Sequence, residues 1–341
     1  MPLPIITSQI VVWPALLVVV ATTALAQPFK LPTANRALFE RGGEERFFAP
    51  TVGKPWTSGT FGCVRTDGWQ MHEGIDIRAV KRDRRGEPID PVMATADGTV
   101  AYINQRTGLS NFGRYIILRH DIEGLEIYSL YAHLSEIRAG LRAGTPVKAG
   151  ETIGVMGRST NTRQQIGKDR AHLHFELDLL INDRFPEWFK KAHPSERNDH
   201  GAWNGRNLVG LDPRRLFLEQ QSRGSAFSLR QFVQQQTELF RVLVRDTRIA
   251  WLRRYPGLMV ANPRLGTQPV AGYELVLDYN GLPFQAISRP AADFAGVAKY
   301  RLLSVNAAEY DRNHCRKLVT RHGNSWLLST QGQSLLDLLT Y

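Results

Sequence analysis

The chain has 341 residues, of which 43% are apolar and 22% are charged, and its formal net charge is +11. This composition is ordinary for a globular protein and excludes a long coiled coil or a largely disordered chain. The length exceeds what one ordinary hydrophobic core needs, so we expect two folded units, and the positive charge predicts anionic partners.

Residues 1–26 contain no Lys, Arg, Asp or Glu. The apolar run from Ile10 to Ala26 ends in Ala24-Leu25-Ala26, a small-x-small pattern that indicates a secretory signal peptide cleaved before Gln27. The usual basic n-region is missing, so retention of the segment as a membrane anchor is the alternative. Pro14 interrupts the run, however, and the unbroken apolar stretch is short for a membrane span.

We therefore expect secretion across the inner membrane to the periplasm or cell envelope, with no stable membrane span after cleavage. Export argues against nucleic acid as the anionic partner and favours an anionic cell envelope. A soluble protein that is simply basic is the plainer interpretation of the same charge.

Residues 27–55 are polar and mixed and are interpreted as an N-terminal extension. From 56 to 216, short runs rich in Val, Ile, Tyr and Thr alternate with turn residues, which is typical of strands. The runs are 98–103, 115–118, 126–131 and 151–155. Many short strands with frequent turns predict a mainly β fold, a compact and mostly antiparallel domain. Residues 186–212 are irregular and are expected to form a long surface loop.

The pattern changes after residue 216. Apolar residues in 228–254 recur at helical spacing, and Ser228 is a plausible N-cap. Residues 273–277 and 284–287 flank Asn280-Gly281, a strong hairpin signal, and 334–339 is predicted to be helical. Residues 217–341 are therefore expected to form a second, α+β domain of unknown role.

Cys63 and Cys315 are the two cysteines of the chain. In an exported protein they could form a disulfide between the two halves, or they could be two separate buried thiols. The sequence leaves both possibilities open.

The segment His172-Leu-His-Phe-Glu-Leu177 alternates polar and apolar residues with a period of two, which predicts a strand. His172, His174 and Glu176 then share one face. The two histidines can reach a common centre, which could be a metal or a metal with its bound substrate.

His72 and Asp76 add an imidazole and a carboxylate four residues apart. Zinc in hydrolases takes three protein ligands from His, Asp and Glu and keeps a fourth position for water. Neither cysteine lies in these motifs, so the residue types favour a zinc site with N and O ligands. Gly74 between them is expected to give the backbone freedom to turn both inward. No His-Glu-x-x-His, Gly-x-Ser-x-Gly or P-loop motif is present.

The remaining histidines are interpreted as ordinary surface or core residues. They are His120, His193, His200, His314 and His322. A weak metal cluster of His314, Cys315 and His322 is a minor alternative. A His-x-His strand by itself is also compatible with ordinary histidines, and spacing alone does not decide the question.

Five ordered segments give residues 61–175 a resemblance to the M23 zinc endopeptidases, the lysostaphin-like or LytM-like peptidases. These segments are Phe61-Gly-Cys-Val-Arg65, His72-Glu-Gly-Ile-Asp-Ile77, Ala94-Thr-Ala-Asp-Gly-Thr-Val100, Tyr131-Ala-His-Leu134 and His172-Leu-His-Phe-Glu176. The resemblance implies an M23-like peptidase domain over 56–216 that cleaves peptide bonds, at D-Ala cross-links or glycine-containing bridges, in bacterial peptidoglycan.

The resemblance also implies roles for individual residues. His72, Asp76 and His174 are expected to bind one zinc ion per chain. His133 and His172 are expected to be catalytic, flanking the attacking water, orienting or deprotonating it and stabilising the oxyanion. No further cofactor is expected.

The chain departs from the family pattern in two places. Residues 80–91 form a longer link than usual, and 163–170 is an insertion that follows Asn161, where Gly is more usual. Both changes put the substrate preference in doubt more than the chemistry. A second class of function is also open, because some LytM-like domains have lost zinc ligands and activate cell-wall amidases without catalysis.

Overall fold

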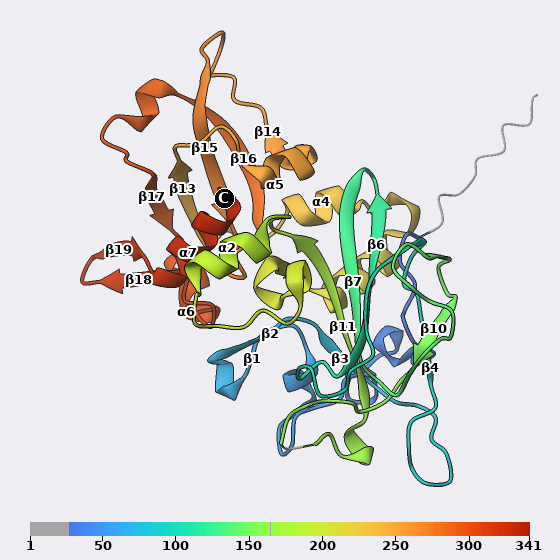
Figure 1. The fold of residues 1–341 in the computed structure, drawn as a ribbon. Helices are drawn as coiled ribbons and strands as arrows, with labels where there is room; N and C mark the ends of the chain where they lie inside the picture. Colours follow the sequence, from blue (N-terminus) through green and yellow to red (C-terminus); the bar gives the residue numbers. More distant parts are fainter. Residues whose placement is uncertain (1–26, 164) are drawn as a thin grey trace, which may run out of the picture.

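A computed structural model describes residues 27–163 and 165–341 (Figure 1). The predicted signal peptide, 1–26, lies outside the described residues. Within the described part of the chain, no helix combines the length and apolar character needed to cross a membrane.

The first half of the chain is built on a seven-stranded antiparallel sheet with the order β12-β11-β7-β6-β5-β9, in which β3 also pairs with β11. Its strands are β3 (Ile75–Arg78), β5 (Gly98–Asn104), β6 (Arg114–Ile122), β7 (Leu125–Leu134), β9 (Pro146–Val147), β11 (His172–Leu180) and β12 (Leu208–Leu211). The expected strands and the mainly antiparallel β fold are confirmed.

Strand β11 is the centre of this sheet. Its nine residues are all buried, because β7 covers one edge while β3 and β12 share the other. Leu173, Phe175 and Leu177 fill the main core, and the opposite face carries the polar residues of the predicted strand. The period-two pattern therefore predicted correctly which residues share each face of β11. The polar face is also buried.

Two smaller sheets lie beside the main one. One pairs β1 (Gly62–Arg65) with β2 (Gln70–His72), and the other contains β4 (Pro91–Met93), β10 (Thr152–Val155) and β8 (Glu136–Ile137). The segment 27–55, interpreted as an extension, packs into the main core through Phe29, Phe47 and Phe48. Its apolar side chains therefore belong to the same folded body as the sheet.

The second half contains a five-stranded sheet with the order β14-β16-β15-β13-β17 and a separate hairpin, β18-β19. The strands are β13 (Phe240–Val244), β14 (Met259–Val260), β15 (Val270–Leu277), β16 (Pro283–Pro290), β17 (Tyr300–Val305), β18 (Val319–His322) and β19 (Ser325–Leu328). The hairpin predicted around Asn280-Gly281 is confirmed as β15 and β16.

Seven α-helices and nine 3₁₀ helices occur in the described residues. The α-helices are α1 (Glu44–Phe47), α2 (Phe185–Ala192), α3 (Pro213–Arg223), α4 (Leu229–Gln234), α5 (Ala250–Arg254), α6 (Ala307–Arg312) and α7 (Thr330–Leu339). The 3₁₀ helices η1 to η9 span Ala37–Phe39, Trp56–Gly59, Thr66–Gly68, Lys168–Arg170, Gly201–Trp203, Gly205–Asn207, Gly224–Ala226, Pro256–Leu258 and Ala291–Phe294. The predicted C-terminal helix is confirmed, and Ser228 caps α4 by accepting from Gln231 N.

Two expectations are corrected. The helical spacing over 228–254 is wrong at its centre, where β13 pairs with β15 and β17 and buries Phe240, Val242 and Val244 between helices α4 and α5. The loop expected at 186–212 contains most of α2 and all of β12, because β12 completes the edge of β11.

The two halves touch directly. Cys63 of β1 forms a disulfide with Cys315, so the pairing that the sequence left open is settled. Asn280 donates to Gly210 O at 2.9 Å, and Tyr255 Oη accepts from Leu180 N at 2.9 Å. The expected boundary between 216 and 217 falls inside α3, and the division into domains at that point stays a prediction.

Candidate metal centre

Strand pairing brings His72, Asp76 and His174 together. Asp76 in β3 lies opposite His174 in β11, and His72 ends β2 four residues before Asp76. Gly74 makes this close approach possible, since a Cβ at this position would lie 2.3 Å from Phe175 O. Glycine is therefore needed at position 74 because a side chain would collide with β11, and not for the backbone freedom that we expected.

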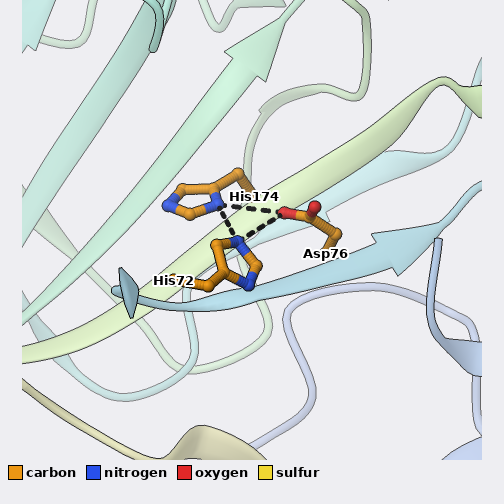
Figure 2. Close-up of side chains that lie close together, drawn as sticks. All are labelled: His72, Asp76 and His174. Carbon is orange, nitrogen blue, oxygen red and sulfur yellow. Dashed lines mark hydrogen bonds and ion pairs between the residues drawn. The ribbon is translucent and has the colours of Figure 1, made fainter. Parts of the chain in front are cut away.

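The three side chains converge on one point, as Figure 2 shows. Asp76 Oδ1 is 3.0 Å from His174 Nδ1, His72 Nε2 is 3.2 Å from His174 Nδ1, and His72 Nε2 is 3.2 Å from Asp76 Oδ1. Ligand atoms around a tetrahedral zinc ion lie about 3.3 Å apart, from metal–ligand distances of about 2.0–2.1 Å. The donor types and their spacing therefore fit a zinc ion, and this is the one such group among the described residues.

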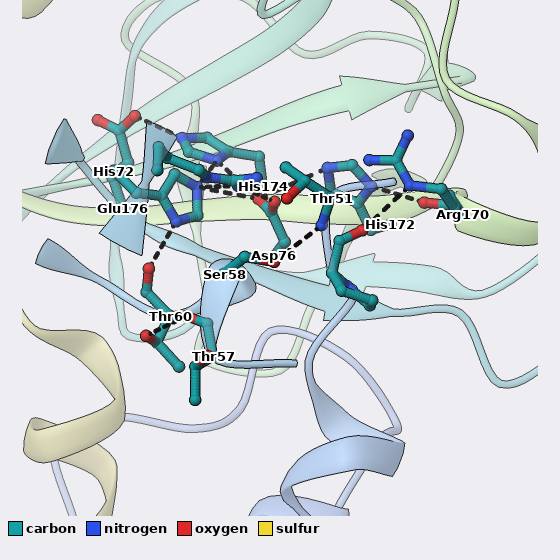
Figure 3. Close-up of polar contacts among 12 residues, drawn as sticks. Thr51, Thr57, Ser58, Thr60, His72, Asp76, Arg170, His172, His174 and Glu176 are labelled. Carbon is teal, nitrogen blue, oxygen red and sulfur yellow. Dashed lines mark hydrogen bonds and ion pairs between the residues drawn. The ribbon is translucent and has the colours of Figure 1, made fainter. Parts of the chain in front are cut away.

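Hydrogen bonds on the outer side of each imidazole fix which nitrogen faces the centre. His72 Nδ1 donates to Thr60 O at 2.7 Å (Figure 3), so its unprotonated Nε2 faces the centre, where Arg65 Nη2 lies 3.0 Å away. His174 Nε2 lies 2.6 Å from Glu176 Oε1, which leaves Nδ1 facing Asp76. Such outer partners hold ligand histidines in the correct tautomer and orientation.

Asp76 divides its two oxygens between the centre and an arginine. Oδ1 faces the histidines, while Oδ2 accepts a hydrogen bond from Arg65 Nη2. Burial opposes ionisation, but His172, His72 and His174 together hold the pKa of Asp76 well below its usual range. The carboxyl group is therefore ionised, as a metal ligand must be.

His172 and His133 lie at the edge of the same centre. Their ring centroids are 4.9 Å apart, and His172 Nε2 is 3.5 Å from Asp76 Oδ1. His172 Nδ1 donates to Arg170 O at 2.7 Å, and His133 Nδ1 donates to Ser159 O at 2.9 Å. In the neutral form of each ring, Nε2 therefore carries no hydrogen. The structure thus brings all five predicted site residues together.

The backbone at His133 is unusual. Its φ angle is +62°, in the left-handed region, at a register shift between β6 and β7. Bulges of this kind turn a side chain away from the alternation of the strand, and they occur near active sites. The shift places His133 beside His172 and His174.

The pKa values of the histidines diverge. Burial, reinforced by the neighbouring His172 and His174, lowers the pKa of His133 to about 3, and burial also lowers that of His172. For His174, burial is outweighed by hydrogen bonds to Asp76 and Glu176, which raise the pKa to about 10. His133 and His172 are therefore neutral proton acceptors at neutral pH, while a proton and a metal cation compete for His174.

Sequence reasoning gave no role to Glu176, Arg65 or Asp178. The sequence pattern already placed Glu176 on the same strand face as His172 and His174. Arg65 is the last residue of Phe61-Gly-Cys-Val-Arg65, the first segment of the family resemblance. Both residues could therefore have been predicted to lie near the site. Asp178 continues the same face, and both of its buried oxygens lack a hydrogen-bond partner among the described residues. Burial, with Glu176 adding to it, raises the pKa of Asp178 well above its usual range.

The other histidines lie outside the cluster. His120 is buried between Asp97 and Ser129, His200 contacts the Tyr115 hydroxyl at 2.6 Å, and His314 packs edge-on against Trp69. Cys315 is bonded to Cys63, so the minor alternative of a cluster with His314 and His322 loses its thiolate.

Comparison with known proteins supports the same site. The sequence model of Peptidase family M23 matches residues 70–184, a segment that contains all five site residues. A search of curated proteins found no match.

Several solved structures are similar. The catalytic domain of the antimicrobial peptidase lysostaphin from Staphylococcus simulans is 21% identical over 51% of this chain and 88% of its own, with a TM-score of 0.28. LytU is 31% identical over 35% of this chain and 69% of its own, with a TM-score of 0.26. A zinc-containing peptidase from Vibrio cholerae is 25% identical over 31% of this chain and 26% of its own, with a TM-score of 0.23.

Proposed function

We propose that this chain, whose residues 70–184 match the model of peptidase family M23, is a zinc-dependent endopeptidase that hydrolyses peptide cross-links of bacterial peptidoglycan. The observation that carries the proposal is the mutual spacing of 3.0–3.2 Å among His72 Nε2, Asp76 Oδ1 and His174 Nδ1. These residues would hold the metal. A bound zinc ion would supply Lewis acidity toward a water molecule and the scissile carbonyl.

His133 and His172 are proposed as the catalytic residues. Each has its Nδ1 committed to a backbone carbonyl, so each presents Nε2 as a proton acceptor. Their lowered pKa values keep that nitrogen unprotonated at neutral pH. One can take a proton from the attacking water, and the protonated ring can then donate to the oxyanion or to the leaving amine.

Glu176 and Arg65 are proposed as positioning residues. Glu176 orients His174 through its Nε2, and Arg65 holds the outer oxygen of Asp76. Neither needs to contact substrate to act in this way.

We further propose that the protein is exported and works in the periplasm or cell envelope. The uncharged, apolar character of residues 10–26 supports this, as does the net charge of +11. The disulfide between Cys63 and Cys315 also favours an oxidising compartment.

A non-catalytic activator of a cell-wall amidase would need a groove and a docking surface but no metal or proton acceptors. Turnover of purified cross-linked peptidoglycan, with zinc and with a chelator, tests the proposal. Mass spectrometry should show cross-linked fragments falling to monomers only with metal. If the cross-linked fragments persist and an added amidase becomes faster, the activator function is correct instead.

A further inference from the structure

A groove of about 800 Å³ opens beside the metal centre. Its walls come from residues 51–58, from the β1–β2 hairpin and from Arg170. Arg65 lies at the junction, since it lines the groove and also contacts Asp76 and His72. A chain segment bound in this groove would therefore reach Arg65, which contacts the proposed metal ligands His72 and Asp76.

The charged residues of the groove wall are mostly basic. Lys54, Arg65 and Arg170 face one acidic residue, Asp67. Lys54 pairs with Asp67 at 2.6 Å, and Arg65 pairs with Asp76. Among the described residues, no carboxylate pairs with Arg170, so its guanidinium group is the wall's uncompensated cation.

Arg170 is held in place at both ends. Its Nε donates to Pro50 O at 3.0 Å. Its backbone carbonyl accepts from His172 Nδ1 at 2.7 Å (Figure 3). The two terminal nitrogens remain available, and a guanidinium group fixed in this way can bind a carboxylate through both of them. Arg170 ends the 3₁₀ helix η4 (Lys168–Arg170), two residues before β11 begins at His172.

The helix η4 is also held by residues 80–91. Arg82 Nη2 of the long 80–91 link donates to Asp169 O at 3.2 Å, and Lys168 pairs with Glu87 at 3.4 Å. These contacts hold η4, and with it Arg170, against residues 80–91.

We propose that Arg170 makes the groove selective for peptides that carry free side-chain carboxylates, in preference to neutral glycine bridges. This inference rests on the proposed peptidase function. A neutral peptide in the groove would remove water from the guanidinium group and leave it without an anionic partner. Peptidoglycan stem peptides with free glutamate and diaminopimelate carboxylates supply that partner.

Binding, measured without turnover, tests this selectivity. The probes are two stem tetrapeptides with amidated C-termini, one with free glutamate and diaminopimelate carboxylates and one with both amidated. Calorimetry with the zinc-loaded full chain should give about tenfold tighter binding of the free-carboxylate peptide, and the difference should shrink at high salt. Arg170→Gln should bring the ratio of affinities close to one, and Arg170→Lys should give an intermediate ratio.

Arg264→Gln is the matched control, because it removes the same charge from an exposed residue outside the groove. It should retain the wild-type ratio, and melting temperatures should show that all variants are folded. Equal binding of both peptides by the wild type, an unchanged ratio in Arg170→Gln, or an equal loss in Arg264→Gln would overturn the proposal. Binding without cleavage of peptidoglycan would instead reject the peptidase function and leave this inference standing.

Discussion

Asp76 and His174 are 98 residues apart in the chain, yet they lie opposite each other across the β3–β11 pair, with Asp76 Oδ1 3.0 Å from His174 Nδ1. A strand register thus positions one half of the candidate metal centre against the other. The following predictions depend on that arrangement and on the residues that support it.

Replacing His174 by Ala should abolish zinc binding, because the substitution removes one of the three ligands and its contact with Asp76. Elemental analysis of the purified chain should show about one zinc per wild-type chain and very little in His174→Ala. Full occupancy in the variant would reject His174 as a ligand.

His133→Ala and His172→Ala should each keep zinc but lose about 10²–10⁴ in rate, because these residues act on protons and not on the metal. The measurement is turnover of cross-linked peptidoglycan alongside zinc content. A variant that is inactive because it has lost its metal would show that the division between ligands and catalytic residues is wrong.

Glu176→Gln should weaken zinc binding by about 10- to 100-fold, since the carboxylate no longer orients and polarises His174. Competition with a fluorescent chelator measures the affinity. Glu187→Gln is a control, because Glu187 is an exposed residue of α2 that pairs with Arg184, outside the metal centre. Equal affinity in wild type and Glu176→Gln would mean that Glu176 has no positioning role.

Reduction of the Cys63–Cys315 disulfide should lower the free energy of unfolding by about 2–5 kcal/mol, because it releases a long closed loop in the unfolded chain. Denaturant unfolding with and without reductant measures the change. A double variant with Ser at both positions should be less stable than the oxidised wild type and insensitive to reductant. Sensitivity of that variant would show that the reductant acts elsewhere.

The free energy of unfolding should fall as the pH drops below neutrality, because His120 is protonated more readily in the unfolded chain than in the folded one. Burial lowers the pKa of His120, although the Asp97 carbonyl and charge oppose this. The other ring nitrogen, Nε2, contacts the Ser129 hydroxyl, which donates to the Tyr131 hydroxyl. The unfolded chain, with a pKa of about 6.5, takes up the proton first, so stability is lost as pH falls through 6.5 toward the lower folded value.

His120 alone should change the free energy of unfolding by at most about 1.4 kcal/mol per pH unit. Unfolding free energies of wild type and His120→Gln between neutral pH and pH 5 measure it. The variant should lack this part of the slope, and an identical slope in both proteins would assign the pH dependence to other groups.

The sequence by itself determined the local features. The alternation in 172–177 set the faces of β11, Asn280-Gly281 set a hairpin turn, and the residue types at positions 72, 76 and 174 set the donor chemistry. These features follow from neighbours within a few residues, so a period or a turn preference is enough to predict them.

Only the tertiary structure decided the rest. Part of the segment with helical spacing forms strand β13, and Cys63 is bonded to Cys315, 252 residues away. Arg65 and Arg170 lie beside the candidate metal centre. Each of these outcomes depends on which distant segments pair and bury one another. No local spacing encodes such pairings, because the burial and electrostatic energies that select them arise only when the segments meet.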